Sequence, residues 1–224
     1  MHLRTIKTRP KPIQIDLERT AVIVVDMQNC FLSKGGMFDL AGLDISRARE
    51  IVPRCKDVID AARKSGCKVI YLRHSYNPDL SDSGGETSPN WYKELGPVFF
   101  RKHPDLKDKL NFEGTWGADI IEDLKPQEGD VVVRKQRFSG FAGTNLDMIL
   151  KTYNIKYLVF IGIASNICVE STIRDAFSLD YFPILISDAV SEAGASFTQE
   201  ATIYNVKFAF GWVIDSEEFC NSLR

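Results

Sequence analysis

The fifteen residues YLVFIGIASNICVES, numbers 157–171, change character part-way along. The first five, 157–161, are continuously apolar, which is typical of a strand that is buried on both faces of a sheet. A helical pattern over residues 166–179 follows almost at once, so the stretch predicts a strand that leads directly into a helix. Cys168 lies at this junction, where it is either a small apolar residue of the core or a reactive group.

The same alternation of strand and helix runs along the chain. It predicts one three-layer α/β/α domain over residues 1–224, with a mainly parallel sheet of six strands between two helical layers. Strands are expected at residues 21–25, 67–72, 130–134, 157–161, 182–186 and 206–210. Helices are expected near residues 44–65, 118–124, 144–153, 166–179 and 196–204, with a last helix after residue 210.

Two segments depart from this alternation. Residues 1–14 carry four basic side chains beside prolines and are expected to form a solvated arm. Residues 73–115 are rich in Pro, Gly, Ser and Asn, which predicts a long loop excursion. Aromatic side chains in this excursion, such as Trp91 and Phe99, argue against disorder. We therefore expect residues 73–115 to fold over a functional site.

The composition argues against several classes of function. The 224 residues carry a formal net charge of −2 and are 44 % hydrophobic, so neither nucleic acid nor a membrane surface is indicated as a partner. No apolar run is typical of a signal peptide or a membrane span. The five cysteines are odd in number and form no C-x-x-C pair, which argues against a disulfide framework or a structural zinc site. A small-molecule partner and a reducing, cytoplasmic location are expected.

Polar residues follow three of the expected strands where these end. Asp26 follows the first strand, Lys135 follows the third, and Cys168 lies in the loop after the fourth. In a parallel sheet, functional groups collect just beyond the carboxyl ends of the strands. Taken singly, Asp26 could cap a turn and Lys135 could be a surface lysine. Together, an acid, a base and a thiol at one sheet edge indicate nucleophilic catalysis.

The position of Cys168 adds a physical argument. It is expected in the first turn of a helix that Ser165 or Asn166 caps. Unpaired amide groups and the positive end of the helix dipole stabilise a thiolate there, which predicts a lowered pKa of the thiol. The same amides can bind an oxyanion. Glu170 would oppose the effect if it faced the thiol, and we expect it to point elsewhere.

These motifs resemble those of the isochorismatase-like cysteine hydrolases, which are amidases with an Asp–Lys–Cys triad on a Rossmann-like sheet. The matching stretches are V-V-D-M-Q-N at 24–29, V-V-R-K at 132–135 and G-I-A-S-N-I-C-V-E-S-T at 162–172. The resemblance implies that Cys168 is the nucleophile, that Asp26 is its general base, and that Lys135 keeps Asp26 ionised. It also implies a cis peptide before Ala164, whose N–H would form an oxyanion hole with the N–H of Cys168. No cofactor is implied.

Further stretches are similar to family members that act on ureidoacrylate. They lie at residues 35–42, 88–90, 137–141, 168–175 and 210–213. The resemblance implies hydrolysis of the ureido C–N bond through a carbamoyl-thioester on Cys168, with 3-aminoacrylate and carbamate as products. Asn90, His74 and Tyr76 lie where the excursion should fold over the site and are expected to bind the substrate, with Arg137 or Arg73 as a partner for its carboxylate.

Nicotinamidases of this family carry a D-x-H metal motif after the second strand. The corresponding stretch here is L-R-H-S-Y at 72–76, which has no Asp two positions before His74. The resemblance therefore implies no bound metal and argues against a nicotinamidase. His74, Tyr76 and Phe138 replace the Asn, Trp and Tyr of the ureidoacrylate enzymes, and these changes leave the substrate open.

Two alternatives stay open. One is a related carbamoyl-amide hydrolase for N-carbamoylsarcosine, biuret or a similar urea. The other is a catalytically idle member that serves as a binding or scaffold module, against which the joint presence of Asp26, Lys135 and Cys168 argues. The family usually forms oligomers, so a homo-oligomer is expected, with the apolar residues 208–212 contributing to its interface.

Overall fold

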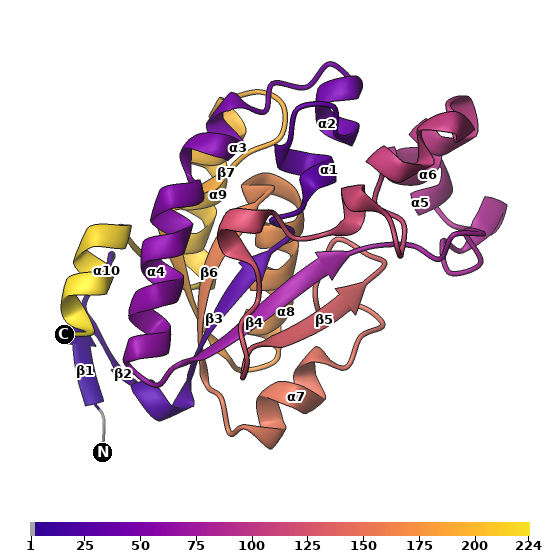
Figure 1. Ribbon diagram of the computed structural model, residues 1–224. Coiled ribbons are helices and arrows are strands. Elements are labelled where there is room, and N and C mark those ends of the chain that lie inside the picture. The colour runs from indigo at the N-terminus through magenta and orange to yellow at the C-terminus, as the bar shows by residue number, and fades with distance from the viewer. Residues whose placement is uncertain (1–2) are drawn as a thin grey trace.

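A computed structural model describes residues 3–224, and its centre is a six-stranded sheet (Figure 1). Neighbouring strands of this sheet run parallel, in the order β5-β4-β3-β6-β7-β8. The expected α/β fold with a parallel sheet is confirmed. The strands are β3 (Thr20–Val25), β4 (Lys68–His74), β5 (Val131–Lys135), β6 (Tyr157–Ile163), β7 (Phe182–Ser191) and β8 (Trp212–Ile214).

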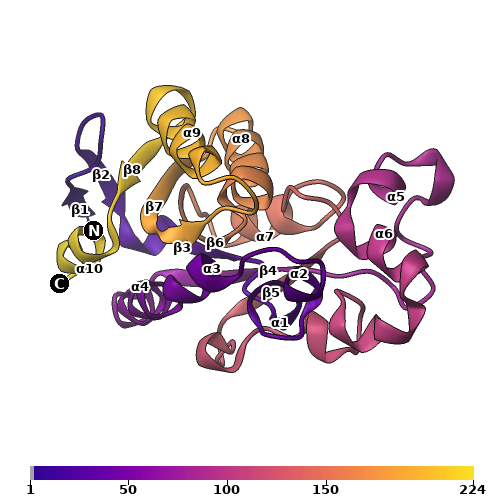
Figure 2. The ribbon, with the colours of Figure 1, turned by 90° about the horizontal axis from the view of Figure 1, so that it is seen from above.

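Helices cover both faces of the sheet, as Figure 2 shows from above. The central strand β3 is buried along its whole length, and its side chains alternate between two apolar clusters. Val22 and Val24 belong to the cluster that contains Val58 of α4, whereas Ile23 belongs to the cluster that contains Ile173 of α8. One helical layer consists of α3 (Ser46–Glu50), α4 (Val52–Lys64) and α10 (Ser216–Ser222), and the other of α7 (Leu146–Thr152), α8 (Glu170–Ser178) and α9 (Phe197–Asn205).

Residues 3–16 form a hairpin instead of the expected solvated arm, whose first two residues lie outside the described range. The side chains of Ile6 and Ile15 are fully buried in an apolar cluster. The backbone of Arg9 pairs with Val213 of β8. The prediction is wrong because Ile6 and Ile15 pack in the apolar core, while the basic side chains of the segment stay at the surface. The hairpin strands are β1 (Leu3–Ile6) and β2 (Ile13–Asp16), which pair antiparallel.

The segment that follows β4, predicted as a long loop excursion, contains short helices. The segment extends beyond the carboxyl end of β4 (Figure 1). Tyr76 and Phe112 pair through a backbone bridge, and both side chains are fully buried. Apolar contacts therefore hold the segment together. Its helices are α5 (Asn90–Lys93) and α6 (Leu95–Lys102), with 3-10 turns at Gly85–Thr87, Pro104–Lys109 and Trp116–Ala118.

Two other elements differ from the sequence prediction. The helix expected at residues 118–124 is a pair of short 3-10 turns, and the strand expected at 206–210 is a π-helical turn that extends α9. The last strand begins only after Gly211, where a Cβ would lie 2.3 Å from the carbonyl oxygen of Pro183. Glycine therefore allows β8 to approach β7. The remaining short elements are α1 (Asn29–Leu32), α2 (Met37–Leu40) and 3-10 turns at Leu17–Arg19 and Glu122–Leu124.

Within residues 3–224, no helix combines the length and the apolar character that crossing a membrane requires.

The buried hairpin makes a prediction for stability. Ile6→Ala removes a fully buried side chain and leaves a cavity, which should lower the free energy of unfolding by about 2–5 kcal/mol. Lys7→Ala, at the exposed neighbouring position, should change it by less than about 0.5 kcal/mol. Urea unfolding followed by circular dichroism compares both variants with the parent chain. Equal urea midpoints of unfolding for all three proteins would contradict the buried hairpin and support a solvated arm.

Candidate active site

Three strand ends meet at one edge of the sheet. Asp26 directly follows β3, Lys135 is the last residue of β5, and Cys168 lies in the π-helical turn after β6. Strand β4 lies between β3 and β5, so Lys135 reaches past its register partner His74. The structure therefore brings together the three residues that the strand-end argument singled out, and it adds His74 to them.

The backbone fixes where these groups leave the sheet. Asp26 has a φ of 51°, a left-handed conformation that is uncommon for residues other than glycine. Next to it, in β6, Gly162 has a φ of 109°, and a Cβ there would lie 2.2 Å from the carbonyl oxygen of Val25. Because position 162 is glycine, β3 and β6 can approach closely just before Asp26 and Cys168.

Asp26 and Lys135 form a buried ion pair. Nζ of Lys135 lies 2.7 Å from Oδ2 of Asp26, and the side chains are 0 % and 2 % exposed, respectively. Nζ also donates a hydrogen bond of 3.1 Å to the carbonyl oxygen of Arg137. Burial by itself would lower the pKa of Lys135, but Asp26 and Cys168 outweigh burial and raise this pKa. Lys135 is therefore a charged ammonium group at neutral pH.

The thiol of Cys168 is in a more buried environment than expected. Burial raises its pKa well above the ordinary value, Asp26 raises it further, and Lys135 acts in the opposite direction. The prediction of a lowered pKa is wrong because the loss of hydration on burial raises the pKa of the thiol more than the start of the helix can lower it. The resting thiol is therefore protonated at neutral pH, and a base must remove its proton before the sulfur can attack.

The side chains expected to cap the turn of Cys168 hold neighbouring elements instead. Ser165 donates a hydrogen bond to a glutamine of α9, and Asn166 exchanges two hydrogen bonds of 3.0 Å with the backbone of Ala193. The capping prediction is therefore wrong. Glu170 is held by Arg174 and by groups of α9, which confirms that its carboxylate is engaged away from the thiol.

The peptide bond between Ile163 and Ala164 is cis, the geometry that the resemblance implied. The carbonyl oxygen of Ala164 accepts hydrogen bonds from the N–H groups of Ile167 and Val169, at 3.0 and 3.1 Å. Ala164 and Cys168 line the same cavity. Their N–H groups as an oxyanion hole remain a prediction.

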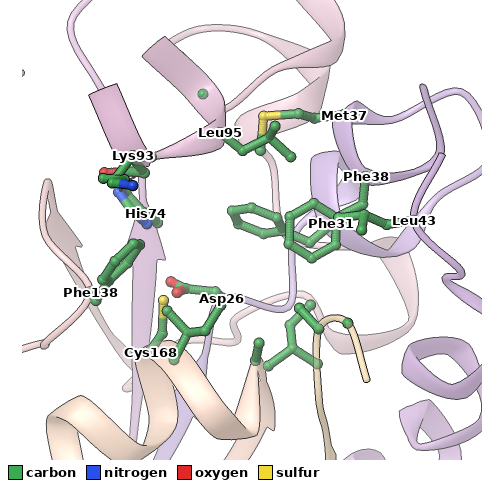
Figure 3. Close-up of a pocket in the computed structure, with 17 residues that line it drawn as sticks. Asp26, Phe31, Met37, Phe38, Leu43, His74, Lys93, Leu95, Phe138 and Cys168 are labelled. Carbon is green, nitrogen blue, oxygen red and sulfur yellow. Dashed lines mark ion pairs between the residues drawn. The ribbon is translucent and has the colours of Figure 1, made fainter. Parts of the chain in front are cut away.

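A cavity of about 320 Å³ opens beside the thiol (Figure 3). Asp26 and Cys168 lie together at one end of it. One wall carries the polar residues His74, Lys93 and Glu94, of which Lys93 is the only Lys or Arg among the described residues of the lining. Apolar side chains form much of the rest, and they include Phe31, Met37, Phe38, Leu43, Leu95 and Phe138.

A buried network braces His74. Its Nε2 lies 2.8 Å from Oε1 of Glu94, and these side chains are 2 % and 6 % exposed. The Tyr76 hydroxyl donates to the other carboxylate oxygen of Glu94. Burial alone would raise the pKa of the Glu94 carboxyl, but His74 and Tyr76 outweigh burial and lower this pKa. No sequence motif points to Glu94, because its contact with His74 depends on how α5 and α6 fold against β4.

The residues predicted to bind substrate separate into two groups. His74 lines the cavity, whereas Tyr76, Asn90 and Arg137 are not part of its lining. Oriented with its amide oxygen toward Arg137, Asn90 accepts hydrogen bonds from Nη1 at 3.1 Å and from Nε at 2.7 Å. Tyr76 is engaged by Glu94. The structure therefore places one of the four residues at the surface of the cavity, and Lys93, which no sequence pattern singled out, also faces it.

The same site contains a set of atoms that could bind a metal ion. A ring nitrogen of His74, the thiol of Cys168 and a carboxylate oxygen of Asp26 lie within 4.8 Å of one another. Imidazole and thiolate are ligands that soft divalent cations prefer. The ammonium group of Lys135 already provides positive charge 2.7 Å from Asp26. The sequence expectation of a metal-free site remains a prediction.

The chain matches a known protein domain over most of its length. The sequence pattern of the isochorismatase domain covers residues 20–218. The chain belongs to the isochorismatase family. Its relatives in this family include a ureidoacrylate amidohydrolase RutB from Serratia proteamaculans, 47 % identical over 98 % of this chain and 88 % of its own length. A protein of the same name from Agrobacterium fabrum is 46 % identical over 96 % of this chain and 95 % of its own.

Solved structures share the fold of this isochorismatase-family chain. A cysteine hydrolase from Pseudomonas syringae pv. phaseolicola has a TM-score of 0.77 and 29 % identity, over 93 % of this chain and 94 % of that one. N-carbamoylsarcosine amidase from Thermoplasma acidophilum has a TM-score of 0.67 and 29 % identity, over 89 % of this chain and 97 % of that one. The likeness therefore extends over 93 % and 89 % of this chain, respectively.

Alkylation of Cys168 by iodoacetamide tests the charges around the thiol. Because Asp26 raises the pKa of the thiol, Asp26→Asn removes a negative charge and leaves Lys135 to stabilise the thiolate. Labelling of the Cys168 peptide, followed by mass spectrometry across pH, should therefore begin at lower pH in Asp26→Asn than in the parent chain. Asp123→Asn, at an exposed position outside the cavity lining, is the control and should label like the parent. An Asp26→Asn profile that stays in place or moves to higher pH contradicts these electrostatics.

Proposed function

We propose that this chain is a cysteine amidohydrolase that cleaves the ureido C–N bond of (Z)-3-ureidoacrylate. The observation that carries the proposal is the buried Asp26–Lys135 ion pair beside the thiol of Cys168, at the end of a cavity. The relatives named ureidoacrylate amidohydrolase, 47 % and 46 % identical over nearly the full length, support this substrate. The products are 3-aminoacrylate and carbamate.

The first half of the reaction forms a covalent intermediate. Asp26 takes the proton of Cys168, and the sulfur attacks the carbonyl carbon of the ureido group. The carbonyl oxygen becomes an oxyanion, which the N–H groups of Ala164 and Cys168 stabilise. Asp26 then gives its proton to the leaving nitrogen, and 3-aminoacrylate departs. A carbamoyl group remains bound to Cys168 as a thioester.

The second half regenerates the thiol. Asp26, a carboxylate again, takes a proton from water, and the oxygen of that water attacks the thioester carbonyl. The C–S bond breaks, the sulfur recovers a proton through Asp26, and carbamate leaves and decomposes to ammonia and carbon dioxide. Lys135 is protonated at rest, because the adjacent carboxylate raises its pKa. Its charge lies 2.7 Å from the carboxylate of Asp26.

The polar wall of the cavity orients the substrate. Glu94 holds His74 beside Asp26 and Cys168, where its ring can donate to the substrate. Lys93, exposed at the rim, supplies positive charge for the substrate carboxylate. Asn90 and Arg137 act behind this wall by holding each other in position.

A related carbamoyl-amide hydrolase is the second candidate function. It is favoured by the likeness to an N-carbamoylsarcosine amidase, which has a TM-score of 0.67. The same thiol chemistry would apply, and the two candidates differ in what is attached to the leaving nitrogen. A catalytically idle scaffold is less well supported, because such a protein has no need of a buried Asp26–Lys135 pair beside a thiol.

The chain is further proposed to act in the cytoplasm as a homo-oligomer. All five cysteines are free thiols, which supports a reducing compartment. Phe197, Tyr204 and Phe208, on and just after α9, are 67 %, 57 % and 76 % exposed, and this apolar surface supports contact with a second copy.

Ammonia release tests the nucleophile and the substrate together. The parent chain should turn over ureidoacrylate faster than N-carbamoylsarcosine or biuret. Cys168→Ser should lower kcat by about 10³-fold or more, because the whole covalent route is lost. Cys67→Ser, at a buried thiol outside the cavity lining, should keep the parent rate. Parent-like turnover by Cys168→Ser would refute the covalent mechanism, and failure to hydrolyse ureidoacrylate would refute the substrate.

Lys93→Met tests the site of the substrate carboxylate. An exposed ion pair contributes up to about 1 kcal/mol, so KM for ureidoacrylate should rise about fivefold with little change in kcat. The neutral primary amide of the same substrate should show no such rise. Lys102→Met, at an exposed position of α6, is the control. An equal effect of Lys93→Met on the acid and the amide would exclude a charge interaction at this position.

A further inference from the structure

A glutamine of α9 connects the π-helical turn of Cys168 to the neighbouring strand. α9 packs against both this turn and β7. The hydroxyl of Ser165, the first residue of the turn, donates a hydrogen bond to Oε1 of Gln199. Nε2 of Gln199 donates in turn to the carbonyl oxygen of Val190 in β7, at 2.9 Å. The amide group of Gln199 therefore joins the start of the turn to the sheet.

The strand β7 is irregular at the place where Gln199 binds it. Phe160 of β6 pairs with Leu185 of β7. The following pair is Gly162 with Val190, so β6 advances by two residues (162 − 160) while β7 advances by five (190 − 185). Such a bulge leaves backbone groups of the strand outside the regular ladder. The side chain of Gln199 satisfies one of them and thereby holds the end of the bulge in place.

The hydrogen bond from Ser165 to Gln199 fixes the start of the turn. Ser165 is fully buried, and Gln199 is the only hydrogen-bond partner of its hydroxyl among residues 3–224. A buried hydroxyl without a partner is costly, so Ser165 stays where this bond can form. Its carbonyl oxygen also accepts a hydrogen bond from the N–H of Glu170, which closes the turn.

The other side-chain contacts of the turn hold different residues. Asn166 exchanges two hydrogen bonds with the backbone of Ala193, and Glu170 accepts hydrogen bonds from two side chains of α9. These contacts fix the second residue of the turn and the residue after its end. Within the described part of the chain, Gln199 alone binds the side chain of Ser165.

Ser165 lies between the two amides of the proposed oxyanion hole. Ala164 directly precedes it, and Cys168 follows three positions later. An amide stabilises an oxyanion only when its N–H points at the position where the negative charge develops. A rotation of the backbone at Ser165 would turn one of these N–H groups relative to the other. The position of Ser165 therefore decides how well the two amides converge.

We propose that Gln199 is a positioning residue for the oxyanion hole, because its amide holds Ser165 so that the N–H groups of Ala164 and Cys168 converge on the carbonyl oxygen of the substrate. The inference rests on the proposed function, since it requires that Cys168 attacks a carbonyl group. Gln199 is not part of the cavity lining, so it acts through Ser165. It serves both halves of the reaction, because each of them passes through an oxyanion.

Two variants remove the hydrogen bond from either side. Gln199→Met keeps the approximate size of the side chain, and Ser165→Ala removes only the hydroxyl. Each should lower kcat for ureidoacrylate by about tenfold or more with little change in KM, because the oxyanion exists only beyond the ground state. The double variant should be no slower than the slower single variant, since both changes break the same contact. Gln127→Met, at an exposed position, is the matched control and should keep the parent rate.

Alkylation of Cys168 distinguishes this role from a general loss of structure. Iodoacetamide reacts at its methylene carbon, so no oxyanion forms on a carbonyl group and the hole is not needed. Cys168 should therefore label at the parent rate in Gln199→Met and in Ser165→Ala. A partly unfolded variant would label faster, because the thiol is buried in the folded chain.

A sulfur analogue of the substrate tests the oxyanion hole itself. In the thiourea analogue of ureidoacrylate the negative charge develops on sulfur, which is larger than oxygen and accepts hydrogen bonds weakly. The parent chain should favour the oxygen compound in kcat/KM, and both variants should show a smaller preference. Loss of each compound is followed by chromatography. The preference is a ratio within one variant, so the fraction of folded protein cancels.

The outcomes separate this inference from the proposed function. Parent-like kcat in both variants overturns the positioning role and leaves the proposed function standing. Faster labelling of Cys168, or a lower kcat with the full preference for oxygen, overturns it as well, because the lost rate then has another origin. If the parent chain hydrolyses N-carbamoylsarcosine and not ureidoacrylate, the proposed substrate fails and the same losses are expected on N-carbamoylsarcosine. Hydrolysis of neither compound overturns both.

Discussion

A buried carboxylate and a buried ammonium group in contact are the constraint on which the site depends. Neither charge is stable alone at that depth, since removing one partner of such a pair typically costs about 3–5 kcal/mol. The pair of Asp26 and Lys135 exists because the parallel register across β3, β4 and β5 brings the ends of these strands together. The neighbouring thiol of Cys168 is buried and protonated at rest. It can still react, because Asp26 is held next to it as the base that removes its proton.

The strands and the three strand-end residues could be predicted because they follow from local sequence. A continuous apolar run such as 157–161 marks a strand covered on both faces, and the residue after such a run lies at the sheet edge. Parallel topology then brings Asp26, Lys135 and Cys168 together without any knowledge of side-chain contacts. Cys168 alone did not identify the site; its position relative to the other two strand ends did.

Features that depend on contacts between distant segments could not be predicted. Glu94 meets His74 only after α5 and α6 fold against β4, and no local pattern encodes that contact. Asn90 and Arg137 come from distant segments, and no local pattern predicts that they hydrogen-bond to each other. The direction of the thiol pKa was missed for the same reason: the start of a helix is visible in the sequence, whereas depth of burial at Cys168 is a property of the folded chain.

The hairpin over residues 3–16 has a consequence for synthesis on the ribosome. Arg9 pairs with Val213, which is added 204 residues later (213 − 9). At about 5–20 residues per second, translation takes roughly 10–40 s to cover that interval. During this time the hairpin lacks β8 and α10, and the side chain of Ile6 has not reached its final burial. The nascent chain therefore presents an apolar surface of the kind that chaperones bind until residues 212–222 have emerged.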